Sequence, residues 1–201
     1  MERRNLTELG YITAIANVPS IRERGILSFR RAREVDHVDL AMAEIQDRRD
    51  GKLVPDVRRR KPGELHDFAP LYICARNPMM YVRSSRHEEI CVLRVDQGVL
   101  ELDGVVVTDG NAASDYTRFA AAPAGLAEVD EEMTFAEYWT DPNVYAYWEK
   151  KRRKCAEVLV PDRVDPSFIT GVYVSCERAR DACAAAAVPW QVTIDAHLFF
   201  R

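Results

Sequence analysis

Short runs of β-branched and aliphatic residues, separated by turn residues, constrain the fold of this 201-residue chain more than any other feature. We expect strands in six of these runs, over residues 71–74, 90–95, 105–107, 158–160, 169–174 and 191–194. Helical spacing of apolar residues predicts helices over residues 19–25, 38–49, part of 137–154 and 177–187. Because helices come early and strands late, without regular strand–helix–strand alternation, we expect an α+β fold with mixed or antiparallel sheets.

No internal repeat, low-complexity tract or linker interrupts the sequence, so we expect a single domain over residues 1–201. Residues 50–64 contain two prolines, two glycines and several cations, a composition that predicts a mobile basic loop. No apolar run approaches the roughly 20 residues that a membrane helix needs. The N-terminus, Met1-Glu2-Arg3-Arg4, carries no apolar signal segment, so we expect a cytoplasmic protein.

One carboxylate stands at the start of a short apolar strand. Residues 158–160 favour a strand, Pro161 ends it, and Glu157 precedes it. Five consecutive cations, residues 150–154, lead into this segment. A carboxylate in a strand built for burial costs free energy unless it is paired or used in chemistry. The alternative is a solvent-facing glutamate on an edge strand, and the segment alone does not decide between the two.

The charge is unevenly distributed, although the formal net charge is only −4. A net negative charge argues against a protein that coats nucleic acid generally. One basic block consists of Arg48, Arg49, Lys52, Arg58, Arg59, Arg60 and Lys61, and a second consists of Lys150, Lys151, Arg152, Arg153 and Lys154. Basic patches on one face of an acidic protein can bind a polyanion, whereas an isolated block is more often a solvated surface.

Cysteines and histidines show no metal-binding pattern. The five cysteines at positions 74, 91, 155, 176 and 183 form no Cys-x-x-Cys pair, and the four histidines at 37, 66, 87 and 197 lack zinc-ligand spacing. We therefore expect reduced, mostly buried thiols and no metal. Cys155 lies two residues before Glu157, but no base is evident near it, so we do not expect it to be a nucleophile.

Several segments follow one another along nearly the whole chain: YITAIANVPSI at 11–21, RGILS at 24–28, EIQDRR at 44–49, LHDFAPLY at 65–72, ARNPMMY at 75–81, TDGNAAS at 108–114 and the Glu157 strand. In that order and at those spacings they resemble the DarT family of bacterial toxins. Members of that family transfer ADP-ribose from NAD to bases of single-stranded DNA, and a cognate DarG antitoxin reverses the mark. The resemblance implies an ADP-ribosyltransferase-like split core of two mostly antiparallel sheets with flanking helices.

The reaction that this resemblance implies breaks the bond between nicotinamide and ribose, so positive charge develops on the ribose. A carboxylate beside the ribose can orient a hydroxyl, stabilise that charge and act as a base on the acceptor nitrogen. Glu157 matches the catalytic glutamate of the family. Arg49 matches its functional arginine, whose guanidinium could hold NAD or stabilise charge on the acceptor base. From the residues alone, Arg49 could instead be an exposed cation at a helix C-terminus.

The resemblance also assigns NAD binding to Tyr11, Thr13, Asn17 and Ser28, together with Arg49. Many relatives carry histidine in place of Tyr11, which could still stack on nicotinamide and form hydrogen bonds. From the residues alone, Tyr11 could be a half-buried strand aromatic. One branch of the family modifies thymine, and another modifies guanine and pairs with an antitoxin of NADAR-type fold. Because Tyr11 departs from the pattern of the thymine branch, we expect guanine to be the acceptor.

A single-stranded substrate must present an unstacked base, and cations together with aromatic side chains grip such a strand. The expected DNA contacts are Arg48, His66, Arg76, Met79, Tyr81, Asn111, Lys151, Arg152 and Arg153. The aromatic residues Tyr138, Trp139, Tyr145, Tyr147 and Trp148 precede the second basic block. Burial of these aromatics in the core is the alternative. His66 is more in keeping with a structural or orienting role, because adjacent strand residues such as Asp67 point to opposite faces.

Three functions remain open at this point. The first is a toxin that modifies single-stranded DNA, with NAD as co-substrate, no metal, and a DarG-type antitoxin of NADAR-type or macrodomain fold as partner. For this function we expect a monomer without membrane association. The second is an ADP-ribosyltransferase that acts on RNA or protein. The third is a non-catalytic nucleic-acid-binding module, which the joint presence of Glu157 and Arg49 disfavours.

Overall fold

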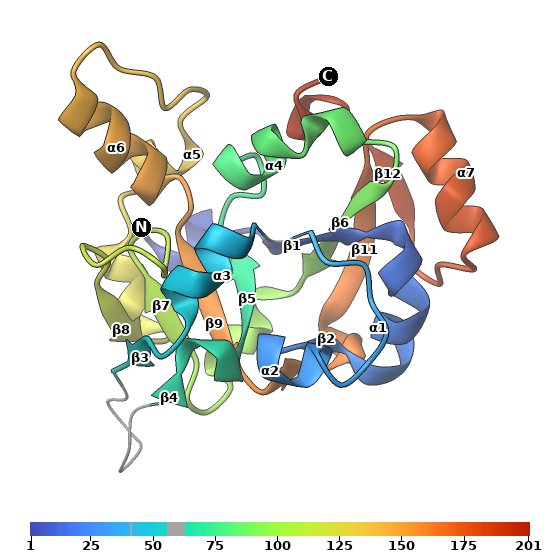
Figure 1. The fold of residues 1–201 in the computed structure, drawn as a ribbon, viewed down its shortest axis with the longest axis horizontal. Helices are drawn as coiled ribbons and strands as arrows, with labels where there is room; N and C mark the ends of the chain where they lie inside the picture. The colour runs from blue at the N-terminus through green and yellow to red at the C-terminus, as the bar shows by residue number, and fades with distance from the viewer. Residues whose placement is uncertain (41, 56–62) are drawn as a thin grey trace.

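The computed structural model describes residues 1–40, 42–55 and 63–201, and an eight-stranded sheet forms its centre (Figure 1). The strand order is β12-β11-β6-β1-β5-β9-β7-β8. The strands are β1 (Leu9–Ala14), β5 (Phe68–Tyr72), β6 (Ile90–Val95), β7 (Val106–Thr108), β8 (Phe119–Ala121), β9 (Glu157–Pro161), β11 (Ile169–Val174) and β12 (Val192–Ile194). Neighbouring strands are antiparallel except for β11 and β12, which run parallel.

The sheet is divided at its middle. Strands β1 and β5 are paired only at Gly10 and Tyr72, whereas β1 pairs with β6 from Leu9 to Ala14 and β5 pairs with β9 over its whole length. The two halves of the sheet are therefore joined through one residue pair. This confirms the α+β class and the split, mostly antiparallel core.

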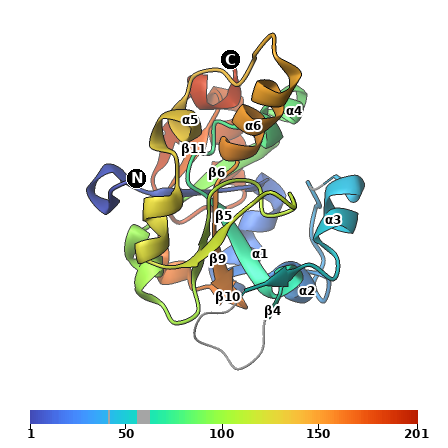
Figure 2. The same cartoon turned by 90° about the vertical axis from the view of Figure 1, so that its left-hand side faces the viewer.

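Helices cover both ends of the sheet, and short strand pairs lie at its margins. The α-helices are α1 (Val18–Arg24), α2 (Phe29–Ala32), α3 (Ala43–Arg49), α4 (Pro78–Val82), α5 (Glu131–Phe135), α6 (Val144–Arg153) and α7 (Glu177–Ala185). Strand β2 (Ile26–Leu27) pairs with β10 (Arg163–Val164), and β3 (Leu53–Val54) pairs with β4 (Gly63–Glu64). Figure 2 shows α1, α2 and α3 on one side of β5 and β9, while Figure 1 shows α5 and α6 extending beyond the sheet.

Short 3₁₀ helices connect several of these elements. They are η1 (Arg3–Asn5), η2 (Ile15–Asn17), η3 (Leu65–Asp67), η4 (Ser84–Arg86), η5 (Gln97–Glu101), η6 (Ala124–Glu128), η7 (Pro166–Phe168) and η8 (His197–Phe199). Apolar side chains from both halves of the sheet, including Leu93, Val158 and Val172, are fully buried in the main core. Among the described residues, no helix is both long and apolar enough to cross a bilayer.

Glycine at position 25 ends α1 and lets β2 approach β10. Gly25 has φ +83°, and a Cβ atom at this position would lie 2.1 Å from the carbonyl oxygen of Val164. Any side chain would therefore collide with the backbone of β10, so the predicted stop after residue 24 has a steric cause.

Two strands and two helices were predicted with nearly the observed bounds. Strands β6 and β11 have the expected bounds, and α1 and α7 agree with expectation to within two residues. The expected helix over 38–49 is wrong in its first part, because helix α3 begins only at Ala43. Residues 137–154 were expected to be helical only in part, and residues 144–153 form α6 while residues 137–143 are not helical. The side chain of Asn143 caps α6 by accepting from the backbone N–H groups of Tyr145 and Ala146.

Strand β1 was not among the six expected strands, but Tyr11 lies on it and is half-buried, as the alternative interpretation of that residue had it. Strand β5 begins three residues earlier than expected. Gly10 and Ala14 lower the strand propensity of β1, and Pro70 argues against a strand over residues 68–72. Ala41 and residues 56–62 of the expected basic loop, which include Arg58, Arg59, Arg60 and Lys61, lie outside the described residues. The five cysteines are free thiols, and Cys91, Cys155 and Cys183 are buried, as expected.

Candidate active site

Glu157 lies in the interior of the sheet and is not on an edge strand. Strand β9 runs between β5 and β7, and the side chain of Glu157 is 1% exposed. Arg49 from α3 donates to both carboxylate oxygens over 3.2–3.3 Å, and the backbone N–H of Ala112 donates to Oε1 over 3.0 Å. The interpretation of Glu157 as a solvent-facing glutamate is therefore wrong.

Arg49 is the last residue of α3, and it points into the protein. It is 8% exposed, so its interpretation as an exposed helix-end cation is also wrong. A contact between residues 108 positions apart brings together the two residues expected to be catalytic. Removing either partner of a buried ion pair would leave the other charge uncompensated.

A cavity of about 820 Å³ opens above this pair. Pockets that bind cofactors commonly have volumes of this order. The predicted site residues that line it are Tyr11, Thr13, Asn17, Arg48, Arg49, His66, Met79, Asn111, Lys151 and Arg152. The fold thus gathers most of the predicted NAD-binding and DNA-binding residues around one space, with Glu157 joined to it through Arg49.

Two tyrosines of the central strands line the same cavity. Burial raises the pKa of Tyr11 to about 12, with the negative charge of Asp39 adding to the effect. Tyr72 stands directly opposite Glu157 in the β5–β9 pair, and burial followed by the charge of Glu157 raises the pKa of Tyr72 well above its usual value. Both phenols are therefore protonated at neutral pH and can donate a hydrogen bond to a ligand.

Tyr72 was not assigned a role from the sequence. The available signal was a phenol at the end of the apolar run 68–72. That run was not expected to begin at Phe68, so its register against Glu157 could not be deduced.

Asn17 fixes the segment that forms one rim of the cavity. Its side chain donates to the carbonyl oxygen of Val38 over 2.9 Å and accepts from the N–H of Val38 over 2.8 Å. It also donates to the hydroxyl of Thr13 over 3.2 Å. Because these bonds hold the backbone of Val38 in place of helical ones, they explain why the expected helix does not begin there. His37, Val38, Asp39 and Leu40 line the cavity from this segment.

His66 contacts helix α3 through Gln46. Its ring packs against Phe29 at a centroid distance of 4.3 Å, and its Nε2 lies 3.1 Å from Oε1 of Gln46. Burial, followed by the positive charge of Arg49, lowers the pKa of His66. A neutral imidazole that contacts the helix carrying Arg49 fits the expected structural or orienting role.

Four predicted site residues lie elsewhere. Ser28 is buried, and its hydroxyl caps α2, while its neighbours Leu27 and Phe29 line the cavity. Arg76 stacks on Phe200 at 4.1 Å and borders a second, smaller cavity of about 230 Å³.

Tyr81 belongs to an aromatic cluster with Trp139 and Phe200, although its own side chain is largely exposed. Arg153 is held by Glu149 over 2.6 Å.

The second basic block is not a continuous surface patch. Lys154 is 1% exposed, and its ammonium donates to the carbonyl oxygen of Thr134 and to Sγ of Cys74. Arg152 is also buried and pairs with Asp109. The expectation of an exposed five-cation run is therefore wrong for these two residues.

An aromatic and basic surface remains on the outer part of α6. Tyr145 and Trp148 are 82% and 58% exposed, and both line the cavity. The ammonium of Lys151 lies 5.1 Å from the ring centre of Trp148. Core burial, the alternative for the aromatic residues, is wrong for Tyr145 and Trp148. Tyr138 is exposed as well.

Within residues 1–40, 42–55 and 63–201, no group of three histidine, cysteine, aspartate or glutamate side chains is arranged to hold a metal ion. Cys155 also lines the cavity, and burial raises the pKa of its thiol to about 12. Such a thiol is protonated at neutral pH and is a poor nucleophile.

Known proteins resemble this chain in sequence and in fold. The family described as "ssDNA thymidine ADP-ribosyltransferase, DarT" matches residues 11–200. A DNA ADP-ribosyl transferase–DNA ADP-ribosyl glycohydrolase fusion protein from Thermosipho africanus is 34% identical over 84% of this chain and 42% of its own length. The chain therefore spans less than half of that fusion protein.

Solved structures of a relative from Thermus sp. 2.9 extend the similarity to the fold. DarT from that organism in complex with ADP-ribosylated single-stranded DNA has a TM-score of 0.83 and 27% identity, covering 97% of both chains. The same protein in complex with NAD⁺ has a TM-score of 0.77 and 25% identity, covering 96% of this chain and 98% of the other.

Proposed function

Because the chain belongs to the DarT family of single-stranded DNA ADP-ribosyltransferases, we propose that it transfers ADP-ribose from NAD to a base of single-stranded DNA and releases nicotinamide. The observation that carries this proposal is the buried Glu157–Arg49 pair beneath a cavity of about 820 Å³. NAD is the co-substrate, and Tyr11, Thr13 and Asn17 lie on the cavity wall where they can contact it.

Glu157 is the proposed catalytic carboxylate. As the bond between nicotinamide and ribose breaks, the ribose gains positive charge, and a fixed carboxylate in a water-poor site stabilises that charge. The same carboxylate can accept a proton from the attacking base. The N–H of Ala112 holds Oε1, so the carboxylate already has a defined orientation before substrate binds.

Arg49 is proposed to act on the ligands as well as on Glu157. Its contacts to the carboxylate, at 3.2–3.3 Å, are at the long end of the hydrogen-bond range. A guanidinium has five N–H donors, so Arg49 can share them with a phosphate of NAD or with a carbonyl of the acceptor base.

The exposed face of α6 is the proposed DNA contact. Trp148 and Tyr145 offer flat surfaces on which unstacked bases can stack, and Lys151 offers a cation for the phosphate backbone. Arg48, from α3, lines the same cavity. This local basic and aromatic surface suits a single strand even though the net charge of the chain is −4.

We propose thymine as the acceptor base. The family description names thymidine, whereas the sequence argument for guanine rested on Tyr11 alone. A phenol and an imidazole can both stack on nicotinamide and donate a hydrogen bond, so Tyr11 is compatible with either acceptor. Guanine is therefore one of the outcomes that the experiment below distinguishes.

We also propose a toxin role with a partner that reverses the modification. The Thermosipho relative combines a DNA ADP-ribosyl transferase with a DNA ADP-ribosyl glycohydrolase, which supports a DarG-type antitoxin of macrodomain or NADAR-type fold for this chain. Residues 1–201 are proposed to act as one catalytic domain and as a monomer.

Intact-mass spectrometry of short single-stranded oligonucleotides, incubated with NAD and the protein, tests the function. The set contains a mixed sequence, one strand without thymine, one without guanine, and matched RNA. We expect one added ADP-ribose on every DNA strand that contains thymine and none on the strand without it. Modification only of guanine-containing strands would assign guanine. Modification of RNA or of the protein alone would refute the DNA assignment.

A further inference from the structure

Every N–H donor of the Arg152 guanidinium is hydrogen-bonded to another side chain of the protein. Its guanidinium forms five hydrogen bonds, to Asp109 at 2.8 and 3.4 Å, to Glu149 at 2.8 and 2.9 Å, and to the hydroxyl of Thr117 at 3.3 Å. A guanidinium carries five N–H groups, so none is left for a phosphate or a base. The side chain of Arg152 is 8% exposed and that of Asp109 is 4% exposed.

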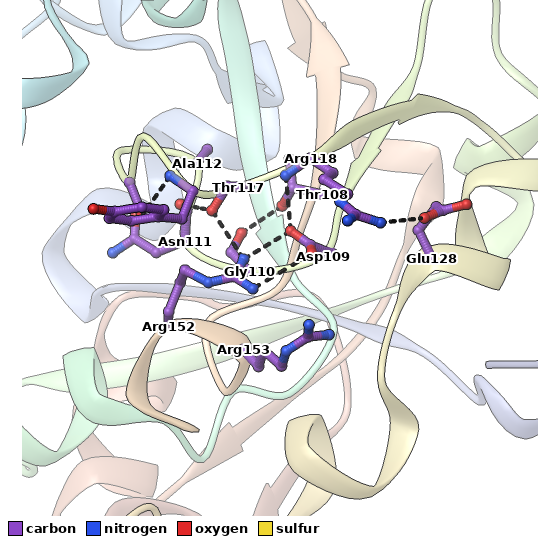
Figure 3. Close-up of polar contacts among 12 residues, drawn as sticks. Thr108, Asp109, Gly110, Asn111, Ala112, Thr117, Arg118, Glu128, Arg152 and Arg153 are labelled. Atoms are coloured by element: carbon purple, nitrogen blue, oxygen red, sulfur yellow. Dashed lines mark hydrogen bonds and ion pairs between the residues drawn. The ribbon is translucent and has the colours of Figure 1, made fainter. Parts of the chain in front are cut away.

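Two of the three partners of Arg152, Asp109 and Thr117, belong to the loop that follows β7, residues 109–117, shown in Figure 3, whereas Glu149 lies on α6 itself. Asp109 lies at the start of this loop and Thr117 at its end, so one side chain ties both ends together. The hydroxyl of Thr117 donates to the carbonyl oxygen of Asn111 over 2.7 Å. The backbone N–H of Asn111 donates to the carbonyl oxygen of Arg152 over 2.9 Å.

Gly110 allows this close packing. A Cβ atom on Gly110 would lie 2.5 Å from Nη1 of Arg152 and 3.0 Å from its Cγ. The loop therefore lies directly against the arginine side chain, and its path depends on the position of that side chain.

The same loop touches Glu157 at two points. Within it, the N–H of Ala112 donates to Oε1 of Glu157 over 3.0 Å. Directly before the loop, at the end of β7, the hydroxyl of Thr108 accepts from the N–H of Glu157 over 2.9 Å and donates to the carbonyl oxygen of Gly110 over 2.7 Å. The position of the loop thus sets the direction of a donor that orients the carboxylate.

We propose that Arg152 is a positioning residue that holds the 109–117 loop so that the N–H of Ala112 orients Glu157 for the transfer reaction. This inference rests on the proposed function, because it assumes that Glu157 is the catalytic carboxylate. It replaces the sequence-based expectation that Arg152 contacts DNA, whereas Lys151, the preceding residue, stays a proposed contact of the strand.

The loop matters most when substrate is bound. Arg49 shares its long contacts to Glu157 with a ligand in the proposed mechanism, so those contacts weaken during the reaction. The N–H of Ala112 then remains as the backbone donor to the carboxylate, and its direction is fixed by Arg152 through the loop. A carboxylate that has lost this donor can rotate away from the ribose, and small displacements of a reacting group cost large factors in rate.

Three substitutions test the inference, and a fourth serves as the matched control. Arg152→Lys keeps the charge but has only three donors, Asp109→Asn keeps the shape but removes the charge, and Thr117→Val removes one hydroxyl at constant volume. Lys151→Met changes the neighbouring cation, which does not touch the loop bonds described above. The measurements are kcat, KM for NAD, and the affinity for single-stranded DNA over a series of salt concentrations.

We expect Arg152→Lys and Asp109→Asn to lower kcat by about 10- to 100-fold, because each change removes charge-assisted hydrogen bonds that hold the loop. Thr117→Val should lower kcat by about threefold to tenfold, because it removes the neutral hydrogen bond to the carbonyl oxygen of Asn111 and the long hydrogen bond from Arg152. In all three, KM for NAD and the salt dependence of DNA binding should stay at wild-type values. Lys151→Met should instead weaken DNA binding and reduce the salt slope by about 0.7, the value for one phosphate contact on a single strand.

A wild-type kcat in folded Thr117→Val and Asp109→Asn would overturn the inference. So would a loss of salt slope in Arg152→Lys equal to that in Lys151→Met, because that result would mean that Arg152 contacts DNA. If Arg152→Lys fails to fold, Thr117→Val decides, because it leaves the Arg152–Asp109 ion pair intact. A Glu157→Gln variant that still transfers ADP-ribose at the wild-type rate would contradict the proposed function itself, and this result does not depend on the role of Arg152.

Discussion

Replacing Glu157 by glutamine separates the chemical role of this residue from its structural role. Glutamine has nearly the same shape, and its carbonyl oxygen can still accept from the N–H of Ala112. The change removes the negative charge that faces Arg49 and that would face the ribose. We therefore expect a modest loss of stability and a large loss of kcat.

The size of each effect follows from the contacts of Glu157. Three hydrogen bonds from Arg49, all at 3.2–3.3 Å, lose their anionic acceptor, and bonds to a charged partner contribute about 1.5–3 kcal/mol. Because these contacts are long and Arg49 borders the cavity, we expect unfolding free energy to fall by about 2 kcal/mol, or Tm by about 4–8 °C. A domain with at least about 5 kcal/mol of stability then remains about 99% folded.

The expected loss of rate is much larger than this change in folded fraction. One fixed group that stabilises transition-state charge contributes about 10²–10³-fold, and Glu157 has a second role as base, so we expect kcat to fall by at least about 10³-fold. Thermal unfolding monitored by circular dichroism gives the stability, and mass spectrometry of a thymine-containing strand gives the rate. A folded Glu157→Gln variant with kcat within tenfold of wild type would refute the catalytic assignment.

Three further predictions concern the rim, the support and the outer surface of the cavity. Asn17→Ala removes the bonds that hold Val38, so KM for NAD should rise by about tenfold with little change in kcat; initial-rate kinetics check this, and an unchanged KM would contradict it. The pKa of His66 is lower in the folded protein than in the unfolded chain. As the pH falls below about 6.5, the unfolded chain therefore binds a proton at His66 more readily than the folded protein does, and the free energy of unfolding decreases. In Tm measurements from pH 8 to 5.5, His66→Gln should lose less stability than wild type, and parallel curves would show that His66 does not contribute. Trp148→Ala should weaken single-strand binding by about 1–3 kcal/mol in fluorescence anisotropy, whereas wild-type affinity would exclude stacking on this ring.

The sequence predicted those parts of the fold in which local pattern and burial agree. Strands β6 and β11 consist of residues that favour strands and that are mostly buried, so their bounds could be read directly. Helix α3 was predicted too long. Two hydrogen bonds between the side chain of Asn17 and the backbone of Val38 prevent a helix from starting at Val38, although the spacing of apolar residues favours one there. Strand β5 was shortened in the prediction by Pro70, which the sheet accommodates.

The candidate site was predictable in its residue types but not in its geometry. Glu157 and Arg49 could be identified from their motifs, yet their contact joins residues 108 positions apart. The donor from Ala112 is a backbone group, so no side-chain pattern could reveal it. The run of five cations near the end of α6 also misled the prediction. Successive helical residues point in directions about 100° apart, so part of the run, including Arg152, faces inward.

The role of Glu157 in the transfer reaction can be tested by a crystal structure with a non-hydrolysable NAD analogue and a thymine-containing single strand. We expect the analogue to occupy the cavity lined by Tyr11 and Arg49, with a hydroxyl of the nicotinamide ribose about 2.6–3.2 Å from the carboxylate of Glu157. We also expect the strand to cross α6 beside Trp148 and Lys151, and this whole arrangement is the predicted result. A ribose beyond hydrogen-bond reach of Glu157, or an analogue bound in the smaller cavity beside Arg76, would contradict it.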